Sequence, residues 1–345
     1  MIAAITIALT ASAAGSKAKP EPLPAPPALL LPGGRSLVYE RMFSSQHDVK
    51  PKRGFWNRVV DFVAGAPEYR SLVRPYSIAV DSRGRVIVTD PGIPGVHVFD
   101  FNQQKYKLIE REGKEAFAAP QCVAVDADDN FYVTDSEAGK IFVFDSDSRF
   151  RRTIGSIKGG EGYFKRPTGI AVDSKAGRIF VSDTLRHKIF VLDREGNILK
   201  TIGQNGALDG DFNFPTELRW TGEELFVVDA MNFRVQAFDA KGTFQYAIRH
   251  PGDEGSGMFR PKGIGLDSER NVYVVDALLG MVQVFNREGQ LLYYFGQGGD
   301  APGEFNLPSG LFIDGGNSIY VVDSFNRRVE VFRYHAAANL AGGSQ

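Results

Sequence analysis

Glu217 and Arg219 are the two residues of this chain whose types and spacing best suit ligand chemistry. They stand two positions apart in a predicted β-strand, where residues i and i+2 share one face. A carboxylate and a guanidinium on one face can meet a charged ligand at the mouth of a channel. They can also pair with each other and close it, and structural ion pairs of this kind are the more frequent case.

Other residues offer little support for catalysis. The histidines show neither the HxxxH nor the HExxH spacing of zinc sites, and they are His47, His97, His187, His250 and His335. Cys122 is the single cysteine, so no intramolecular disulfide forms, and its apolar neighbours predict a core thiol. The glycine-rich segment 296–299 precedes no predicted helix, so it lacks a phosphate-binding helix N-terminus. We predict no catalytic residue, no metal site and no cofactor.

A sequence repeat must position these side chains, and it occurs six times. Each copy reads Pro-x-x-apolar-x-apolar-Asp, then a turn, then apolar-x-Val-x-Asp. The prolines are spaced by 45, 47, 48, 46 and 47 residues, and they are Pro75, Pro120, Pro167, Pro215, Pro261 and Pro308. The final aspartates keep the same interval, and they are Asp90, Asp135, Asp183, Asp229, Asp276 and Asp323. A period of this size over six copies is typical of a repeat architecture such as a propeller.

The third repeat divides into four predicted strands, at residues 169–172, 178–182, 189–192 and 198–202. β-Branched and aromatic residues fill these strands, and Gly, Asp and Asn clusters separate them. Runs such as Ile141–Phe144 are apolar on consecutive residues, which indicates a strand that is buried on both faces. A propeller blade that is packed between two other blades has this property.

The segments Pro167–Asp173, Ile179–Asp183 and Lys188–Asp193 resemble the NHL repeat. The glycine-rich connection Gly203–Pro215, with its Phe212, is similar to the linker between blades in that family. The resemblance covers about residues 36–335 and implies an all-β fold, a six-bladed β-propeller with four-stranded antiparallel blades. It implies no single activity, because propellers carry unrelated functions.

The two ends of the repeat region predict how the ring closes. The sixth repeat ends with its third strand at Val329–Phe332, and Leu37–Phe43 resembles an isolated fourth strand. We predict that this N-terminal strand pairs with the last blade and removes the exposed sheet edges. The propeller then spans residues 36–335, between a proline-rich linker at residues 16–35 and a flexible tail at residues 336–345.

In this architecture, the loops between second and third strands and the starts of the first strands resemble the face that propellers usually use for ligands. The candidate ligand-binding residues on this face are Glu217, Arg219, Arg186, His187, Asn232, Phe233, Asn326 and Arg327. The repeated aspartates are predicted instead to form turns by accepting backbone N–H bonds. The bases five residues after four of them are also predicted to be structural, and they are Lys140, Lys188, Arg234 and Arg328.

The formal net charge of −1 gives no support for nucleic-acid binding, which needs a basic face. The bases gathered at residues 149–166 are predicted to form a solvated loop rim. Residues 1–15 contain an apolar run, Ile2–Leu9, followed by small residues, which resembles a secretory signal without its positive start. We expect an exported monomer, periplasmic or extracellular, with membrane association through the N-terminus alone.

These observations favour a non-catalytic binding or scaffold propeller that engages a protein or a small ligand on one face of the ring. The alternative is a metal-dependent propeller hydrolase or lyase, of the lactonase or amidating-lyase kind. Such an enzyme needs several His, Asp, Glu or Asn side chains that converge on the channel, and among the channel positions the sequence offers Glu217. Three or more such groups in the channel would favour the enzyme.

Overall fold

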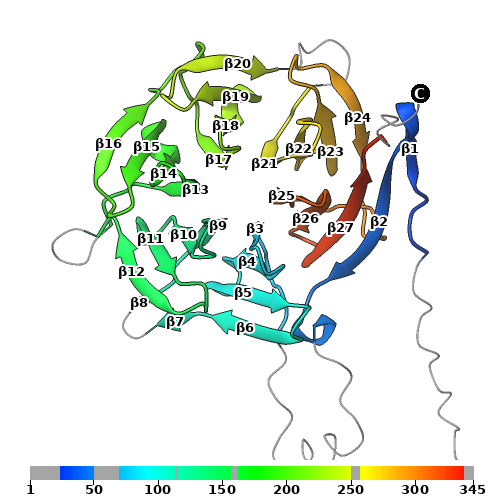
Figure 1. Cartoon of the computed structure of the whole chain (residues 1–345), viewed down its shortest axis with the longest axis horizontal. Helices are drawn as coiled ribbons and strands as arrows, with labels where there is room; N and C mark the ends of the chain where they lie inside the picture. Colours follow the sequence, from blue (N-terminus) through cyan, green and yellow to red (C-terminus); the bar gives the residue numbers. More distant parts are fainter. Residues whose placement is uncertain (1–23, 50–69, 113–114, 157–161, 250–256, 338–345) are drawn as a thin grey trace, which may run out of the picture.

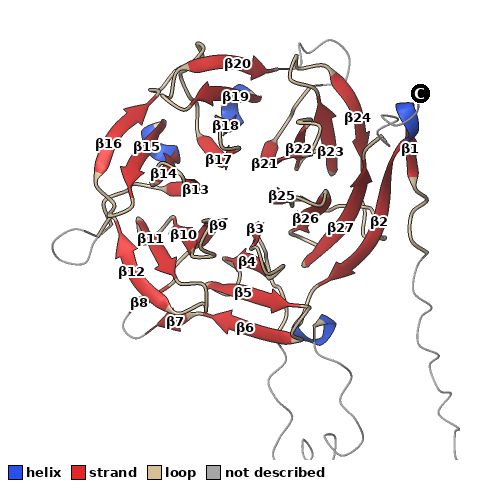
Figure 2. Ribbon diagram, in the orientation of Figure 1, coloured by secondary structure: helices blue, strands red, loops and turns tan. Residues whose placement is uncertain are grey.

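The computed structural model describes residues 24–49, 70–112, 115–156, 162–249 and 257–337. In these residues six antiparallel sheets stand in a ring, with one strand of each sheet at the centre (Figure 1). Strands make up nearly all of the regular structure, and the helices are short 3-10 turns (Figure 2). The chain therefore has the predicted six-bladed β-propeller fold. Within the described ranges, no helix is long and apolar enough to span a membrane.

Blades 1 to 5 each have four strands, which follow one another along the chain from the channel outward. Blade 1 has β3 (Ser77–Val80), β4 (Val86–Asp90), β5 (Gly95–Asp100) and β6 (Lys105–Ile109). Blade 2 has β9 (Pro120–Val125), β10 (Phe131–Asp135), β11 (Lys140–Phe144) and β12 (Phe150–Ile154). Blade 3 has β13 (Pro167–Asp173), β14 (Arg178–Asp183), β15 (Lys188–Asp193) and β16 (Ile198–Ile202).

The second half of the ring repeats this order. Blade 4 has β17 (Pro215–Trp220), β18 (Glu224–Asp229), β19 (Arg234–Asp239) and β20 (Phe244–Ile248). Blade 5 has β21 (Pro261–Leu266), β22 (Val272–Asp276), β23 (Met281–Phe285) and β24 (Leu291–Phe295). Blade 6 has β25 (Leu311–Ile313), β26 (Ser318–Asp323), β27 (Arg328–His335) and β2 (Arg35–Phe43), with β1 (Leu29–Leu31) outside β2. The remaining short elements are β7 (Arg111–Glu112), β8 (Glu115–Ala116), η1 (Pro32–Gly34), η2 (Gln46–Asp48), η3 (Thr184–Arg186) and η4 (Ala230–Asn232).

Strand β2 closes the ring as predicted. It pairs antiparallel with β27 and places Phe43 opposite Val329. The Phe43 ring is buried, with its centre 5.0 Å from the Phe99 ring and 5.1 Å from the Phe101 ring of blade 1. The N-terminal strand therefore completes the last blade and also packs it against the first.

The structure corrects the linker expected at residues 16–35, because Leu29–Leu31 forms strand β1 on the outer edge of β2. The chain reverses between the two strands through Gly33 and Gly34, whose φ angles are 73° and 75°. Glycine adopts this left-handed backbone at little cost. Leu31 packs against the core cluster between blades 5 and 6, so the leucines form a strand despite the proline-rich composition around them.

The hydrophobic core lies between neighbouring blades. One cluster joins Phe180 and Val191 of blade 3 to Leu218 and Phe238 of blade 4, and all four side chains are buried. The run Ile141–Phe144 is buried at every position, as its consecutive apolar residues predict. Burying one such side chain stabilises a fold by roughly 1.5–3 kcal/mol, so the contacts between blades hold the ring together.

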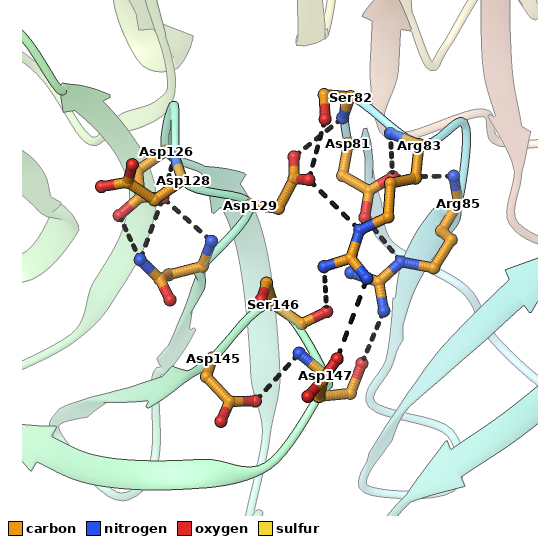
Figure 3. Close-up of polar contacts among 12 residues, drawn as sticks. Asp81, Ser82, Arg83, Arg85, Asp126, Asp128, Asp129, Asp145, Ser146 and Asp147 are labelled. Atoms are coloured by element: carbon orange, nitrogen blue, oxygen red, sulfur yellow. Dashed lines mark hydrogen bonds and ion pairs between the residues drawn. The ribbon is translucent and has the colours of Figure 1, made fainter.

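The aspartates that end the first strands form turns, as predicted. In blade 1, Asp81 Oδ1 accepts hydrogen bonds from the backbone N–H of Arg83 at 3.1 Å and of Arg85 at 2.8 Å (Figure 3). The next turn, in blade 2, is tied to this one because Asp129 accepts a hydrogen bond from the Ser82 hydroxyl at 2.8 Å. These carboxylates hold the ends of the innermost strands in place.

Candidate functional site

The ring has two faces, each with a hollow around the channel. The upper face is formed by the starts of the innermost strands and by the loops at residues 91–94, 136–139, 184–187, 230–233, 277–280 and 324–327. The lower face carries the turns between first and second strands. The upper hollow has a volume of about 470 Å³ and the lower one about 890 Å³.

The strand-ending aspartates shape the upper face. As predicted, all six accept backbone N–H bonds. Asp90, Asp135 and Asp276 accept them from the loop that follows, for example Asp90 Oδ1 from Gly92 N at 2.8 Å. Asp183, Asp229 and Asp323 accept them from the segment before their blade. Three of these buried carboxylates also accept a hydrogen bond from the backbone N–H of an arginine that precedes a repeat proline. The distances are 3.0 Å for Arg74 and Asp90, 3.0 Å for Arg166 and Asp183, and 3.2 Å for Arg260 and Asp276. The framework aspartates thus fix the backbone that carries these arginines.

Three arginines and a lysine surround the upper end of the channel. Arg74, Arg166 and Arg260 precede the proline in blades 1, 3 and 5, which are alternate blades of the ring. Lys262 follows the proline in blade 5. All four line the upper hollow, and no Asp or Glu lines it among the described residues.

These arginines lack counter-ions, unlike the bases of the framework. In the described part of the chain, no carboxylate pairs with the guanidinium of Arg74, Arg166 or Arg260. By contrast, Arg234 pairs with its loop aspartate at 2.8 Å, as Arg328 does with Asp323, which confirms the predicted structural role of both. Cations that converge without partners repel one another. In the framework of this fold the arginines are paired with carboxylates, and the three unpaired arginines depart from that rule. Such departures concentrate at functional sites.

Tyr76 and Lys262 form the floor of the upper hollow. The Lys262 ammonium lies 5.1 Å from the centre of the Tyr76 ring, close enough for a cation–π contact. Burial lowers the pKa of Lys262, and the nearby Arg260 lowers it further. Burial raises the pKa of Tyr76 well above its usual value, so its hydroxyl stays protonated and can donate a hydrogen bond. That hydroxyl has no hydrogen-bond partner among the described residues.

Glu217 lies deeper, buried in the channel. Its Oε2 accepts a hydrogen bond from the Cys122 thiol of blade 2 at 2.9 Å. Burial raises the pKa of Glu217, while Arg219 and the thiol oppose that shift. Burial also raises the pKa of Cys122 well above its usual range, and the Glu217 charge adds to this. The thiol is therefore protonated and inert, which agrees with the core role predicted for it.

Arg219 forms no direct ion pair with Glu217. Its guanidinium donates to the backbone carbonyls of Ile264 at 3.1 Å and Leu311 at 2.8 Å, in blades 5 and 6. It also lies 4.8 Å from the centre of the Phe312 ring. Arg219 therefore spans three blades and lines the lower hollow, while Glu217 is engaged by the thiol of blade 2.

Arg186 and His187 lie in the upper loop of blade 3. Arg186 stacks on Tyr163, with 4.9 Å from its guanidinium to the ring centre, and lies 3.7 Å from the carboxylate of Asp183. His187 Nδ1 accepts a hydrogen bond from the backbone N–H of Phe214 at 3.2 Å. Both predicted residues sit on the expected face, but Arg186 is engaged by blade 3 and the segment before it, and His187 holds the junction between blades 3 and 4.

Asn232 and Asn326 brace the upper loops of blades 4 and 6. Each amide donates to its loop aspartate, at 2.8 Å for Asp229 and 2.7 Å for Asp323. Each also donates to a backbone carbonyl of the preceding inter-blade linker. These two residues belong to the framework of the upper face, and their side chains are not turned toward the upper hollow.

Phe233 and Arg327 occupy one position in two blades and lie in different surroundings. Phe233 is 49% exposed and lines a separate hollow on the outer side of blade 4, beside Tyr246. Arg327 lines a hollow of about 400 Å³ together with Arg74 and Phe325, next to the upper mouth. Of the predicted loop residues, Arg327 is the one that the structure brings beside the unpaired arginines.

The basic run at residues 149–166 divides in the structure. Arg149 lies 3.1 Å from Asp147 and Arg151 lies 3.3 Å from Asp145, as expected for a solvated rim. Arg166 instead reaches the upper hollow. Lys158 lies outside the described residues.

The cations of the upper hollow, which are Arg74, Arg166, Arg260 and Lys262, were not predicted as site residues, although the sequence carries a signal for the three arginines. The residue before the repeat proline is arginine in every second copy, and the six are Arg74, Ala119, Arg166, Phe214, Arg260 and Leu307. In a closed ring of six blades, alternate blades stand a third of a turn apart around the axis, so this alternation places the three arginines around one end of the channel. Aligning the copies on the proline and reading one position back would have shown it.

The lower hollow has a different charge. Its lining includes five carboxylates and three cations, and they are Asp81, Asp126, Asp129, Asp267, Glu223, Lys175, Arg219 and Arg270. Among the described residues, no three His, Cys, Asp or Glu side chains gather closely enough to hold a metal ion. Several of the lower carboxylates are already bound in turns, as Asp81 and Asp129 are.

A family model described as a six-bladed β-propeller matches residues 121–205. No curated protein matches the chain in sequence. The sequence match agrees with the fold and covers blade 2, blade 3 and the linker that follows. It does not distinguish the NHL repeat from other propeller repeats.

Solved structures with the same architecture cover most of the chain. A protein of unknown function from Bacteroides thetaiotaomicron has a TM-score of 0.61 at 14% identity, over 87% of this chain and 76% of that one. An auxiliary nutrient binding protein from the same organism has a TM-score of 0.60 at 13% identity, over 77% and 70%. Virginiamycin B lyase from Staphylococcus aureus has a TM-score of 0.56 at 14% identity, over 87% and 99%. At these identities the likeness shows the fold alone, and the chain is a six-bladed β-propeller.

Proposed function

We propose that this protein is a binding propeller that captures its ligand or partner on the upper face, at the mouth of the channel. The observation that carries the proposal is the upper hollow, which is lined by Arg74, Arg166, Arg260 and Lys262 and by no carboxylate among the described residues. Cations without counter-ions are positioned for an opposite charge that arrives from outside.

Exposed apolar side chains around the hollow support a binding role. On the loops and strand starts of the upper face, the exposed large apolar residues are Val73, Phe214, Met231, Phe233, Phe259, Leu278 and Phe325. Phe325, which is 57% exposed, lines the upper hollow itself. Aromatic and arginine side chains together are what the energetic centre of an interface uses.

The alternative, a metal-dependent hydrolase or lyase, has less support from the channel. The channel groups on the floor of the upper hollow and below it are Tyr76, Cys122, Glu217 and Lys262, with Glu217 as the carboxylate. That carboxylate is held by a protonated thiol, so it is poorly placed to bind a cation. The similarity to an auxiliary nutrient binding protein is consistent with a binding role, while the similarity to a lyase keeps the alternative in view.

The finer family and the location are part of the same proposal. We infer an NHL-type repeat from the pattern in segments such as Pro167–Asp173, and an exported protein from the apolar run Ile2–Leu9. The run lies outside the described residues. N-terminal sequencing of the native protein tests export, and an intact Met1 on a cytosolic protein would contradict it.

A retention experiment tests the binding role. The immobilised wild-type chain and the variant Phe325→Ala/Arg327→Ala are exposed to an extract of the native source, and retained molecules are identified by mass spectrometry. The control Ile198→Ala/Leu199→Ala removes two exposed apolar side chains from the outer strand of blade 3. We expect a molecule that the wild type and the control retain and the upper-face variant loses. Equal retention by all three would remove the upper face as the working surface.

A further inference from the structure

We propose that the upper hollow binds a small ligand that carries several anionic groups, carboxylates or phosphates, held by Arg74, Arg166 and Arg260. This inference rests on the proposed function, because it names the ligand class for the same face. Three features of the hollow carry it, and they are the kind of hydrogen-bonding groups that line it, their arrangement, and its size.

The charged groups that line the hollow are all donors, and the neutral side chains of Gln121, Ser309 and Ser324 both donate and accept. Each guanidinium presents five N–H donors and no acceptor, and Lys262 presents three. The Tyr76 hydroxyl adds a protonated donor without a partner in the described part of the chain. A neutral sugar or peptide needs both donors and acceptors around it. A lining whose charged groups are all donors matches carboxylate and phosphate oxygens, which accept only.

The arrangement of the arginines favours more than one anionic group. They stand on alternate blades, so their guanidinium groups approach the axis from three directions. Each backbone is fixed by a buried aspartate at 3.0–3.2 Å, which reduces the entropy lost when a ligand is gripped. A guanidinium binds a carboxylate or a phosphate through two parallel hydrogen bonds. Three such forks from three sides suit a compact ligand with two or three anionic groups.

The size of the hollow selects a small molecule. Its volume of about 470 Å³ lies within the range of small-ligand sites. Its floor is closed by Tyr76 and Lys262, which are in cation–π contact. Phe325 on the wall supplies an apolar surface for the uncharged part of the ligand. An extended polyanion such as a nucleic acid would need a long basic surface, which a net charge of −1 does not indicate.

The experiment titrates two probes, citrate and inorganic pyrophosphate, into the full chain by isothermal titration calorimetry at constant ionic strength. The test variant is Arg74→Gln/Arg166→Gln/Arg260→Gln. The matched control is Arg149→Gln/Arg151→Gln/Arg194→Gln, which removes the same charge from exposed positions on blades 2 and 3. Neutral glycerol serves as the uncharged probe. Thermal melts of all three proteins confirm that they are folded.

We expect saturable binding of at least one anionic probe to the wild type and to the control, with none for glycerol. Each arginine removed should weaken binding roughly tenfold, so the test variant should show no measurable binding. Binding of citrate over pyrophosphate assigns a polycarboxylate, and the reverse assigns a phosphorylated ligand. Absence of binding of either probe to the wild type, or equal binding by the test variant, overturns the anion site. In that case a molecule still lost by Phe325→Ala/Arg327→Ala would leave the binding role of the upper face standing.

Discussion

The ammonium of Lys262 lies 5.1 Å from the centre of the Tyr76 ring, although the two residues belong to blades 5 and 1 and blade 6 stands between them. The contact closes the floor of the upper hollow and leaves the other donors of its wall free. It also explains how a partly buried lysine is kept beside Arg260 without a carboxylate, because the aromatic face supplies negative potential. The hollow therefore keeps its positive charge without a carboxylate in its lining.

Neutralising the three mouth arginines should stabilise the free protein. Arg74→Gln/Arg166→Gln/Arg260→Gln removes mutual repulsion and breaks no ion pair among the described residues. We expect a gain of about 0.5–1 kcal/mol in the free energy of unfolding at low ionic strength, and a smaller gain at high salt. Thermal melts at two salt concentrations measure it. A variant that melts well below the wild type would show that these arginines are structural.

Closure of the ring should depend on Phe43. Replacing it with alanine leaves a cavity between blades 6 and 1, where it contacts Phe99 and Phe101. We expect a loss of about 3–5 kcal/mol, measured by urea unfolding. Met42→Ala, at a neighbouring position that is 46% exposed, is the control and should cost far less. Equal stability of Phe43→Ala and wild type would contradict closure by β2.

The paired arginines of the framework should behave in the opposite way to those of the mouth. Arg234 is 3% exposed and lies 2.8 Å from the buried carboxylate of Asp229. Arg234→Ala leaves that charge without its ion pair, and we expect a loss of about 3–5 kcal/mol. Arg186 is half-buried and lies 3.7 Å from Asp183, so Arg186→Ala should lower the free energy of unfolding by about 1 kcal/mol. Chemical denaturation of both variants checks the ranking, and similar losses would contradict it.

Glu330 should make the stability of blade 6 depend on pH. Burial raises its pKa from 4.5 to about 7, against the opposing effects of Arg328 and the Gly303 N–H. The pKa of Glu330 is higher in the folded protein than in the unfolded chain. The contribution of Glu330 to the free energy of unfolding is therefore fully present below about pH 4.5 and is lost as the pH rises through about 7. In Glu330→Gln this loss, on the order of 3 kcal/mol, should disappear. Arg328 keeps Asp323 at 2.8 Å, so the variant should still fold.

Thermal melts of wild type and Glu330→Gln at pH 5 and pH 8 measure this effect. The difference between the two proteins isolates one group from the other titrating residues. Between pH 5 and pH 8 the wild type should lose more stability than the variant does, so the melting temperature of the variant minus that of the wild type should be larger at pH 8. A difference between the proteins that is the same at both pH values would contradict the raised pKa.

The sequence predicted the fold because each copy of the repeat carries its own strands, turns and core residues. Six prolines and six aspartates fix the period, and Leu37–Phe43 could be recognised as the missing fourth strand because the sixth copy lacks one. Strand β1 was not predictable in the same way. Leu29–Leu31 belongs to no repeat, and it becomes a strand only because β2 offers it an edge.

The candidate site was predicted less well, for a geometric reason. Glu217 and Arg219 break the repeat, and both reach the channel, but each is engaged by other blades, by Cys122 at 2.9 Å and by Leu311 O at 2.8 Å. Convergence across the axis depends on residues that are far apart in the chain. A search for exceptions to the repeat within one strand finds Glu217. Arg74 and Arg260 are far apart in the chain, and they come to line the same hollow only when the ring is closed.

A crystal structure of the wild-type chain grown with citrate at low millimolar concentration is the decisive test of the anion site, because it shows where the anion binds. We predict citrate in the upper hollow, with carboxylate oxygens at about 2.7–2.9 Å from guanidinium nitrogens of Arg74, Arg166 and Arg260, above the Tyr76 ring. The same experiment with the triple glutamine variant should show an empty hollow. Citrate bound elsewhere, or an upper hollow that is empty in the wild type at saturating citrate, would contradict the proposed site.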